Sequence, residues 1–397
     1  LNENEITAQL IGLDDKGIFT KKTKFIIVGS VALAVLFIAL IIIIAVSSSK
    51  KSSGKASEES SPEEPKDILG EISCTYNVRS ISKNTQLLSN EFKKSTNFDI
   101  EIDGQKIKFS KDYRFKSTGM NTVKFLLYEP IDMDFIFKDV YDIISIKMSS
   151  NKNLEIKSMI SAFEDCQELI EIVIKGFDTS KVTSMKKLFY RTGIDKIDMS
   201  DLSTVSVTDM SYMFASTDII YLDVSSMDTS KVETMASMFQ FSGSLESLDL
   251  STFNTENVKD MSNMFFFCSS LSNLNLSGFK TSKVINMNSM FRECIGLTEL
   301  NLDMFDTSQV NDMGYMFENL CSVKSLNLKK FDTKNVYNME HMFSYTSNLE
   351  NLDVSSFDTS NVENMSNMFY LSRSLTKLDI NRRSEEGSAG MPRPISY

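Results

Sequence analysis

The chain has 397 residues, enough for two or three domains, and its 42% hydrophobic and 24% charged residues match a globular protein, which excludes disorder throughout. A formal charge of −11 argues against a general nucleic-acid-binding protein, which needs clustered lysine and arginine. A single histidine and five scattered cysteines argue against histidine-based catalysis, a His-rich metal site and a small disulfide scaffold. The unusual feature is the abundance of methionine (23) and phenylalanine (28), which the later parts of the chain explain.

The first predicted element is a membrane helix. Residues 25–46 contain no charge, and a helix of that length is about 33 Å long, enough to cross a hydrocarbon core of about 30 Å. Four lysines precede the run and three follow it, which favours residues 1–24 as a short cytosolic tail and the larger part of the chain outside the cell. The alternatives are the reverse orientation and a cleaved signal peptide. The predicted location is therefore a single-pass membrane protein that contacts the lipid bilayer through residues 25–46.

Two regions separate this helix from the rest of the chain. Residues 47–67 are rich in Ser, Lys and Glu, so we expect a flexible stalk. Residues 68–150 contain short strand-like runs, and Asp103-Gly104 between two of them is a hairpin signal. We predict a β-rich N-terminal cap that covers the open edge of the array that follows. An independent binding domain is the alternative.

An internal repeat fills most of the remaining chain. Eight units follow one another at steps of 25, 25 and then five times 26 residues, and their first residues, at offset 0, are Phe177, Leu202, Met227, Phe253, Phe279, Phe305, Phe331 and Phe357. Counted from there, threonine stands at offset 2, valine at 5, methionine at 8 and phenylalanine at 12, and offset 11 is methionine except for Leu188. The excess of methionine and phenylalanine is therefore the composition of one repeated unit.

The apolar spacing predicts one strand and one short helical turn per unit. Offsets 5, 8, 11 and 12 lie on one face of a short helix or 3₁₀-like turn, whereas the following Leu-x-x-Leu-x-Leu alternates as a strand does. We predict an α/β repeat fold, a leucine-rich-repeat-like solenoid over residues 151–380 with a parallel β-sheet face of roughly nine strands. Its methionines should fill the core, and its threonines should fix a turn by hydroxyl–backbone hydrogen bonds. Residues 381–397 break the register, and we expect a disordered tail.

The repeat also carries a family resemblance. The string LDLSxFDTSxVxxMxxMFxxCxxL, of which residues 353–369 are almost a consensus copy, closely resembles the BspA-like leucine-rich-repeat surface proteins. The resemblance covers about residues 155–380. It implies a secreted or surface-exposed protein linked to adhesion and to host or matrix binding. The N-terminal anchor has no counterpart in the repeat, so surface display depends on the orientation of the membrane helix.

The residues that vary between units on the predicted sheet face form the candidate binding surface. We expect this face to bind a protein or glycan ligand, and the alternative function is a membrane-tethered intracellular scaffold. The candidate binding residues are Glu246, Ser247, Asp249, Ser272, Asn273, Asn275, Thr298, Glu299, Asn301, Lys324, Ser325, Asn327, Glu350, Asn351 and Asp353.

Catalytic and cofactor signals are missing from the sequence. It has no P-loop, no GxGxxG, no GxSxG and no CxxC, so we predict no enzyme, no cofactor and no metal site. His341 stands at a variable position and is expected on the surface. Cys166, Cys268 and Cys294 share one offset and are interpreted as small buried thiols, with a Cys268–Cys294 disulfide as the alternative. Asn275 and Asn364 begin glycosylation sequons that only a eukaryotic secretory pathway would use.

Overall fold

The computed structural model of the protein describes residues 66–94 and 97–379. The predicted cytosolic tail, the membrane helix, nearly all of the stalk and the C-terminal tail lie outside these described residues. Within the described part of the chain, no helix is long and apolar enough to cross a membrane.

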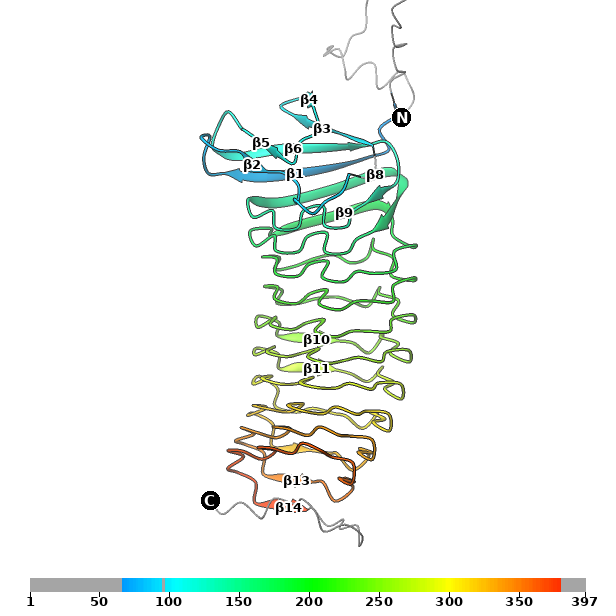
Figure 1. Cartoon of the computed structure of the whole chain (residues 1–397), viewed down its shortest axis with the longest axis vertical. Coiled ribbons are helices and arrows are strands. Elements are labelled where there is room, and N and C mark those ends of the chain that lie inside the picture. Colours follow the sequence, from blue (N-terminus) through cyan, green and yellow to red (C-terminus); the bar gives the residue numbers. More distant parts are fainter. Residues whose placement is uncertain (1–65, 95–96, 380–397) are drawn as a thin grey trace, which may run out of the picture. The chain divides into compact units, whose positions relative to one another are not determined.

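The first described element is a twisted β-sheet at the N-terminal end of the stack of turns (Figure 1). Its strand order is β4-β3-β6-β1-β8-β7, with β9 beside β8. The strands are β1 (Gly70–Val78), β3 (Phe98–Ile102), β4 (Gln105–Ile107), β6 (Gly119–Leu127), β7 (Ile131–Asp132), β8 (Ile143–Ser158) and β9 (Glu171–Asp178). A separate pair joins β2 (Thr85–Gln86) to β5 (Asp112–Tyr113).

Two features explain this sheet locally. β1 buries every second residue, as a strand with one face on the core must. The predicted hairpin at Asp103-Gly104 is confirmed, since both residues have positive φ (53° and 71°) and join antiparallel β3 and β4 through a two-residue turn.

The sheet changes from antiparallel to parallel pairing as it meets the solenoid. β1 pairs with β8 antiparallel, whereas β8 pairs with β9 in parallel one turn later. The two parts share one core, because the Phe125 ring of β6 meets Phe137 edge-on at a centroid distance of 5.8 Å. The antiparallel sheet therefore occupies the edge that a first turn would otherwise leave open.

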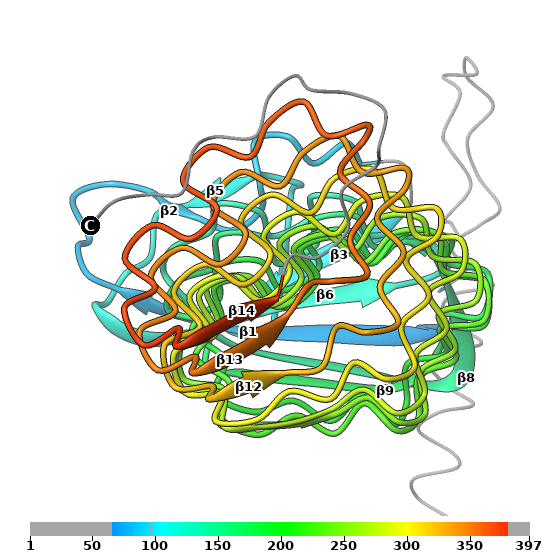
Figure 2. The same cartoon turned by 90° about the horizontal axis from the view of Figure 1, so that it is seen from below.

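The array is a β-solenoid whose turns follow nearly the same outline when viewed along the axis (Figure 2). The predicted helical turn of each unit is wrong, because the described residues contain no helix. Successive i→i+3 hydrogen bonds do occur, as from Leu188 N–H to the Met185 carbonyl, but residues at offsets 10 and 14 have left-handed φ. Lys187 (55°) and Arg191 (57°) are one such pair, and the change of hand prevents the turns from continuing as a helix.

Hydrogen bonds between turns replace those of a helix. The N–H groups at offsets 8, 10, 12 and 14 each donate to a carbonyl of the next turn, as Met339, His341, Phe343 and Tyr345 do at 2.7–2.9 Å. The residues at offset 7 form a ladder of single parallel bridges, one per turn, from Ser184 to Asn364. This side of the solenoid is therefore a turn-rich ribbon bonded along the axis like a parallel sheet.

The opposite side contains the predicted strands, but they are shorter and less continuous than expected. β10 (Ser247–Asp249) pairs with β11 (Asn273–Asn275), and β12 (Ser325–Leu326), β13 (Asn351–Asp353) and β14 (Lys377–Asp379) form a second group. All these pairs are parallel and join equivalent residues of adjacent turns. Between the two groups, residues 299–301 pass without strand pairing, so the predicted uninterrupted sheet of leucine-rich-repeat type is not formed.

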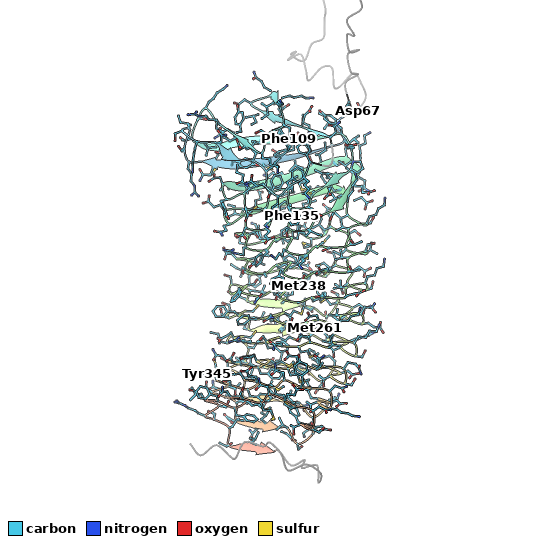
Figure 3. The ribbon with its side chains drawn as sticks, in the orientation of Figure 1. Asp67, Phe109, Phe135, Met238, Met261 and Tyr345 are labelled. Carbon is cyan, nitrogen blue, oxygen red and sulfur yellow. The ribbon has the colours of Figure 1, made fainter. Side chains whose placement is uncertain are left out.

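The interior is built from the repeated apolar positions, as predicted. Ten phenylalanine rings stack from Phe137 to Phe369, with neighbouring centroids 5.6–6.1 Å apart and planes within 21° of parallel. This is the offset-stacked geometry that aromatic quadrupoles favour. The methionines at offsets 8 and 11 are buried in every unit except for Met365 of the last turn, which is partly buried, and Met238 and Met261 of these ladders are labelled in Figure 3.

The threonine ladder connects turns to one another. The buried Thr281 hydroxyl donates to the Asp306 carbonyl of the next turn (2.9 Å) and accepts the Asp306 N–H (2.8 Å). Thr255, Thr307 and Thr333 repeat both contacts. The predicted hydroxyl–backbone bonds are therefore present, but they join adjacent turns.

All five cysteines are free thiols, so the structure contains no Cys268–Cys294 disulfide. Cys166, Cys268 and Cys294 are buried, and each Sγ donates to the carbonyl of a stacked phenylalanine at 2.9–3.0 Å. Burial raises the pKa of the Cys268 thiol to about 12, so the reactive thiolate is not populated at neutral pH.

Candidate functional site

The fifteen predicted binding residues lie on one lateral face of the solenoid, here called the sheet face. Twelve are exposed and three are half-buried (Ser247, Asn275 and Asp353). Parallel register arranges them in three columns along the axis. Column A contains Glu246, Ser272, Thr298, Lys324 and Glu350; column B contains Ser247, Asn273, Glu299, Ser325 and Asn351; column C contains Asp249, Asn275, Asn301, Asn327 and Asp353.

Column C has a structural task. Each of its side chains accepts the backbone N–H of the residue two positions later, at 2.9–3.4 Å, and thereby forms the turn that ends the strand. The Ser251 N–H holds the pKa of the Asp249 carboxyl below its usual range. Columns A and B contain the side chains of this face that vary in type without such a role, so they are the better candidates for ligand contact.

The sheet face is acidic. Its fifteen residues include five carboxylates (Glu246, Asp249, Glu299, Glu350 and Asp353) and one lysine, a sum of −4. One further residue that the sequence did not suggest belongs to this face: Tyr221 forms a parallel bridge to Ser247, and its exposed hydroxyl donates to Glu246 Oε2 at 2.6 Å. Its unit has 25 residues, so its offset differs by one from that of its neighbours in column B.

A second lateral face, which we call the turn face, is formed by offsets 10, 13 and 14. Of these positions, the sequence alone points only to His341, at offset 10, as a surface residue. The structure brings Phe241, Phe266 and Phe267 together there, with ring centroids 4.9–6.4 Å apart. Phe241 is 47% exposed and Phe267 44% exposed, and both have left-handed φ. Asn319 has the same backbone at offset 14, so the turn does not require an aromatic residue.

Aromatic and cationic side chains continue along the turn face. The Arg292 guanidinium lies 5.0 Å from the Phe266 ring and 4.8 Å from the Tyr315 ring, and Tyr315 stacks on His341 at 4.9 Å. His341, which is expected on the surface from the sequence, is half-buried on the turn face. Glu318, almost fully buried, pairs with Arg292 at 2.5 Å. Burial raises the pKa of the Glu318 carboxyl, and the Arg292 charge opposes that shift.

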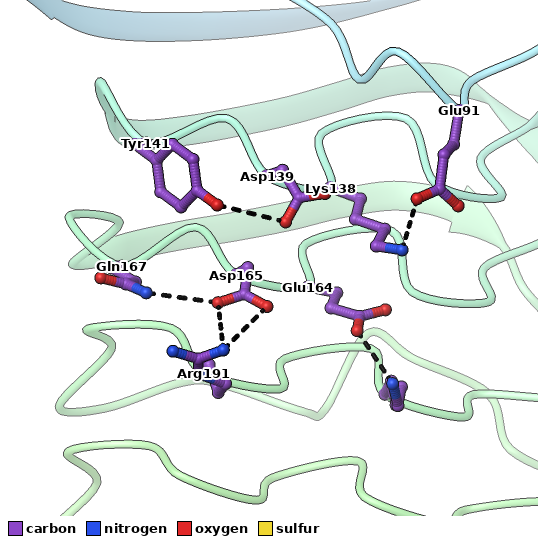
Figure 4. Close-up of polar contacts among 9 residues, drawn as sticks. Glu91, Lys138, Asp139, Tyr141, Glu164, Asp165, Gln167 and Arg191 are labelled. Carbon is purple, nitrogen blue, oxygen red and sulfur yellow. Dashed lines mark hydrogen bonds and ion pairs between the residues drawn. The ribbon is translucent and has the colours of Figure 1, made fainter.

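Near the N-terminal sheet, the turn face is charged instead (Figure 4). Burial raises the pKa of the Asp139 carboxyl, which accepts the Tyr141 hydroxyl at 3.5 Å. One ion pair joins the loop after β2 to the first turn, and two join successive turns. These pairs are Glu91–Lys138 (2.6 Å), Glu164–Lys187 (2.9 Å) and Asp165–Arg191 (3.0 Å). Their carboxylates are all engaged, so the cluster acts as a connection between turns.

Metal ligation has no support in the described part of the chain, where no three His, Cys, Asp or Glu side chains gather to hold an ion. One hollow there, of about 570 Å³, lies between residues 90–93 and residues 132–135, and several of the side chains that line it are charged. Both lateral faces are instead regular surfaces suited to contact with a macromolecule.

The repeat region matches one known family. The family model described as "Mycoplasma protein of unknown function, DUF285" matches residues 131–246, 191–299, 240–325 and 293–386, which together span more than half of the chain. No curated protein matches the chain. No solved structure matches it either.

Proposed function

The chain belongs to the family of Mycoplasma proteins of unknown function, DUF285, and we propose that it is a membrane-anchored surface protein that recognises a protein or glycan partner. The contact would be made by columns A and B of the sheet face. The relation to BspA-like surface proteins is part of this proposal, and the nearly consensus string at residues 353–369 supports it.

One observation carries the proposal: every repeated residue type has a task inside the frame, and the variable residues point outward. Phenylalanine, methionine and valine fill the core, and threonine joins the turns. Columns A and B then present different side chains at equal intervals of about 4.8 Å, the separation of neighbouring strands. A rigid frame with changeable surface residues is the usual arrangement of repeat proteins that bind other molecules.

A binding role fits the chemistry better than catalysis does. Four of the five thiols are buried, and the one histidine is stacked on Tyr315 within the turn face. The negative sheet face favours a partner that brings positive charge, because complementary potentials speed association and reject like-charged competitors. A cationic protein therefore fits better than an anionic glycan.

Membrane topology decides where such a partner could be met. Cells that express the full chain would be treated with protease before and after lysis. We expect the solenoid to be cut on intact cells, because the lysine distribution favours a cytosolic N-terminus. Cleavage only after lysis would reject the surface proposal and favour the intracellular scaffold.

A charge experiment tests the sheet face directly. The full chain in detergent micelles is passed over an immobilised oligolysine peptide, and the salt concentration of elution is measured. The sheet-face variant is E246Q/E299Q/E350Q, and the matched control, which removes three exposed charges elsewhere, is D201N/E256Q/E363Q. We expect only the sheet-face variant to elute at markedly lower salt. An equal loss in the control would mean that net charge, not this face, governs binding.

A further inference from the structure

The C-terminal end of the solenoid presents hydrogen-bond donors that every earlier turn uses. In the preceding turn, the N–H groups at offsets 8, 10, 12 and 14 donate to carbonyls of the last turn at 2.7–2.9 Å. In the last turn, the equivalent N–H groups have no acceptor among the described residues. They belong to Met365, Asn367, Phe369 and Leu371. An amide left without a partner costs free energy unless water or another chain segment satisfies it.

The same end exposes apolar side chains that are buried elsewhere. Val336, Met339 and Phe343 are fully buried in the preceding turn, whereas their counterparts Val362, Met365 and Phe369 are only partly buried. Leu378 of β14 is 39% exposed, but Leu352, one turn earlier, is 2% exposed. The end of the array therefore combines unpaired donors with a partly uncovered apolar layer.

The unpaired donors and the partly exposed apolar layer define what kind of segment could bind at this end. The occupant must offer backbone carbonyls at alternate residues and apolar side chains between them, which is how an extended segment adds to a sheet edge. The first turn of a second copy cannot serve, because the antiparallel sheet already covers it. The C-terminal end of a second copy would bring the same row of donors, not acceptors.

We propose that residues 380–397 of this chain occupy the end of the solenoid and supply the missing carbonyls. The segment follows β14, which lies at this end (Figure 1). Eighteen residues reach up to about 60 Å when extended, and the donor row from Met365 to Leu371 needs only about 20 Å. The family match also continues past β14, to residue 386.

The composition of the segment suits this role. Met391, Ile395 and Tyr397 can cover the partly exposed valine, methionine and phenylalanine of the last turn. Pro392 and Pro394 lack an N–H but keep their carbonyls, and the four unpaired N–H groups of the last turn require only hydrogen-bond acceptors. A segment that the sequence alone predicts to be disordered thus acquires a physical reason to bind.

Hydrogen exchange tests the proposal. The full chain in detergent micelles is compared with a chain that ends after Asp379, and exchange is localised to single amides by fragmentation. The four end amides should exchange at least roughly tenfold faster in the shortened chain, because their acceptors are gone. The amides of Met339, His341, Phe343 and Tyr345 serve as internal references for the fold and should change little. A synthetic peptide of residues 380–397 added to the shortened chain should restore protection.

Two other results of the exchange experiment would overturn the proposal. Equally fast exchange in both chains would mean that the tail leaves the end uncovered. Equally slow exchange in both chains would mean that residues 380–397 do not supply the acceptors, and a doubled mass in light scattering would then show that, against the expectation above, a second copy covers this end. If the shortened chain loses its reference protection, the full-length variant M391S/I395S replaces it, with S384A/S388A as the matched control. Unchanged end amides in that variant would then refute the assignment.

Discussion

The hydroxyl of Thr281 offers a direct test of how the turns are held together. The substitution Thr281→Val keeps the shape of the buried side chain and removes only its hydroxyl, which joins both backbone groups of Asp306 in the next turn (2.8 and 2.9 Å). The matched control is Thr298→Val, because Thr298 is exposed on the sheet face and its side chain has no hydrogen bond among the described residues.

The magnitude follows from the two groups that lose a partner. A buried N–H or carbonyl left unsatisfied costs about 1–3 kcal/mol, and the backbone of Asp306 lies near the surface, where water can relieve part of that cost. We therefore expect a local destabilisation of about 2–3 kcal/mol, and less than 0.5 kcal/mol in the control. Since 1.4 kcal/mol changes an equilibrium constant by a factor of ten, the opening that exposes the Asp306 amide should become more frequent, and its hydrogen exchange should accelerate roughly 30- to 150-fold.

Hydrogen exchange is the appropriate assay, because long repeat arrays need not unfold in one step and a single melting temperature averages over the turns. The Asp306 amide, in the turn after the substitution, should lose protection more than the Val284 amide, in the turn of Thr281 itself. A larger effect at Val284 would refute the connection between turns. So would equal effects of the buried and the exposed substitution.

Three further results are expected. Met261→Asp should cost several kcal/mol because it buries an unpaired charge, whereas Met120→Asp, 64% exposed on β6, should unfold as the parent does; equal behaviour would contradict the inward methionine ladder. Gly278→Ala should destabilise the array more than Gly243→Ala in chemical denaturation, since its Cβ would lie 2.3 Å from a backbone oxygen of the previous turn. Acid should weaken the turns that end the strands, because carboxyls such as that of Asp249 have a lowered pKa in the folded protein. Their contribution to stability is present above the unfolded-state pKa of about 3.9 and should disappear as the pH falls through the folded-state pKa. An acid titration followed by circular dichroism would measure this loss.

The two lateral faces differ in what can be inferred from sequence. Columns A and B follow from the alternation of strand residues between core and solvent. β10 and β13 confirm that alternation, because each buries its central leucine, whereas the central Leu274 of β11 is only half-buried. The sequence does not predict the turn face, although Phe266 and Phe267 directly follow a buried phenylalanine and complete an unusual Phe-Phe-Phe run. The left-handed backbone at offsets 10 and 14 turns these side chains outward. The residue types at these offsets do not predict a left-handed backbone.

The sequence by itself determined the unit length, the number of turns and the identity of the core ladders. These properties follow from periodicity, because a residue type that recurs every 26 positions must meet its own copies when the units stack. It did not decide between a helix and a series of turns on the second side of each unit. The spacing of Val258, Met261, Met264 and Phe265 suits both conformations, since both bring residues three apart to one face.

Only the tertiary structure decided that question. A helix pairs its N–H groups within one segment, whereas here the alternate N–H groups find acceptors in the next turn, which does not exist until the units have stacked. The same reasoning applies to the threonines, whose partners lie in the following turn, and to the last turn, whose donors have no described partner. Local preference is read along the chain, but in a solenoid the decisive hydrogen bonds run along the axis.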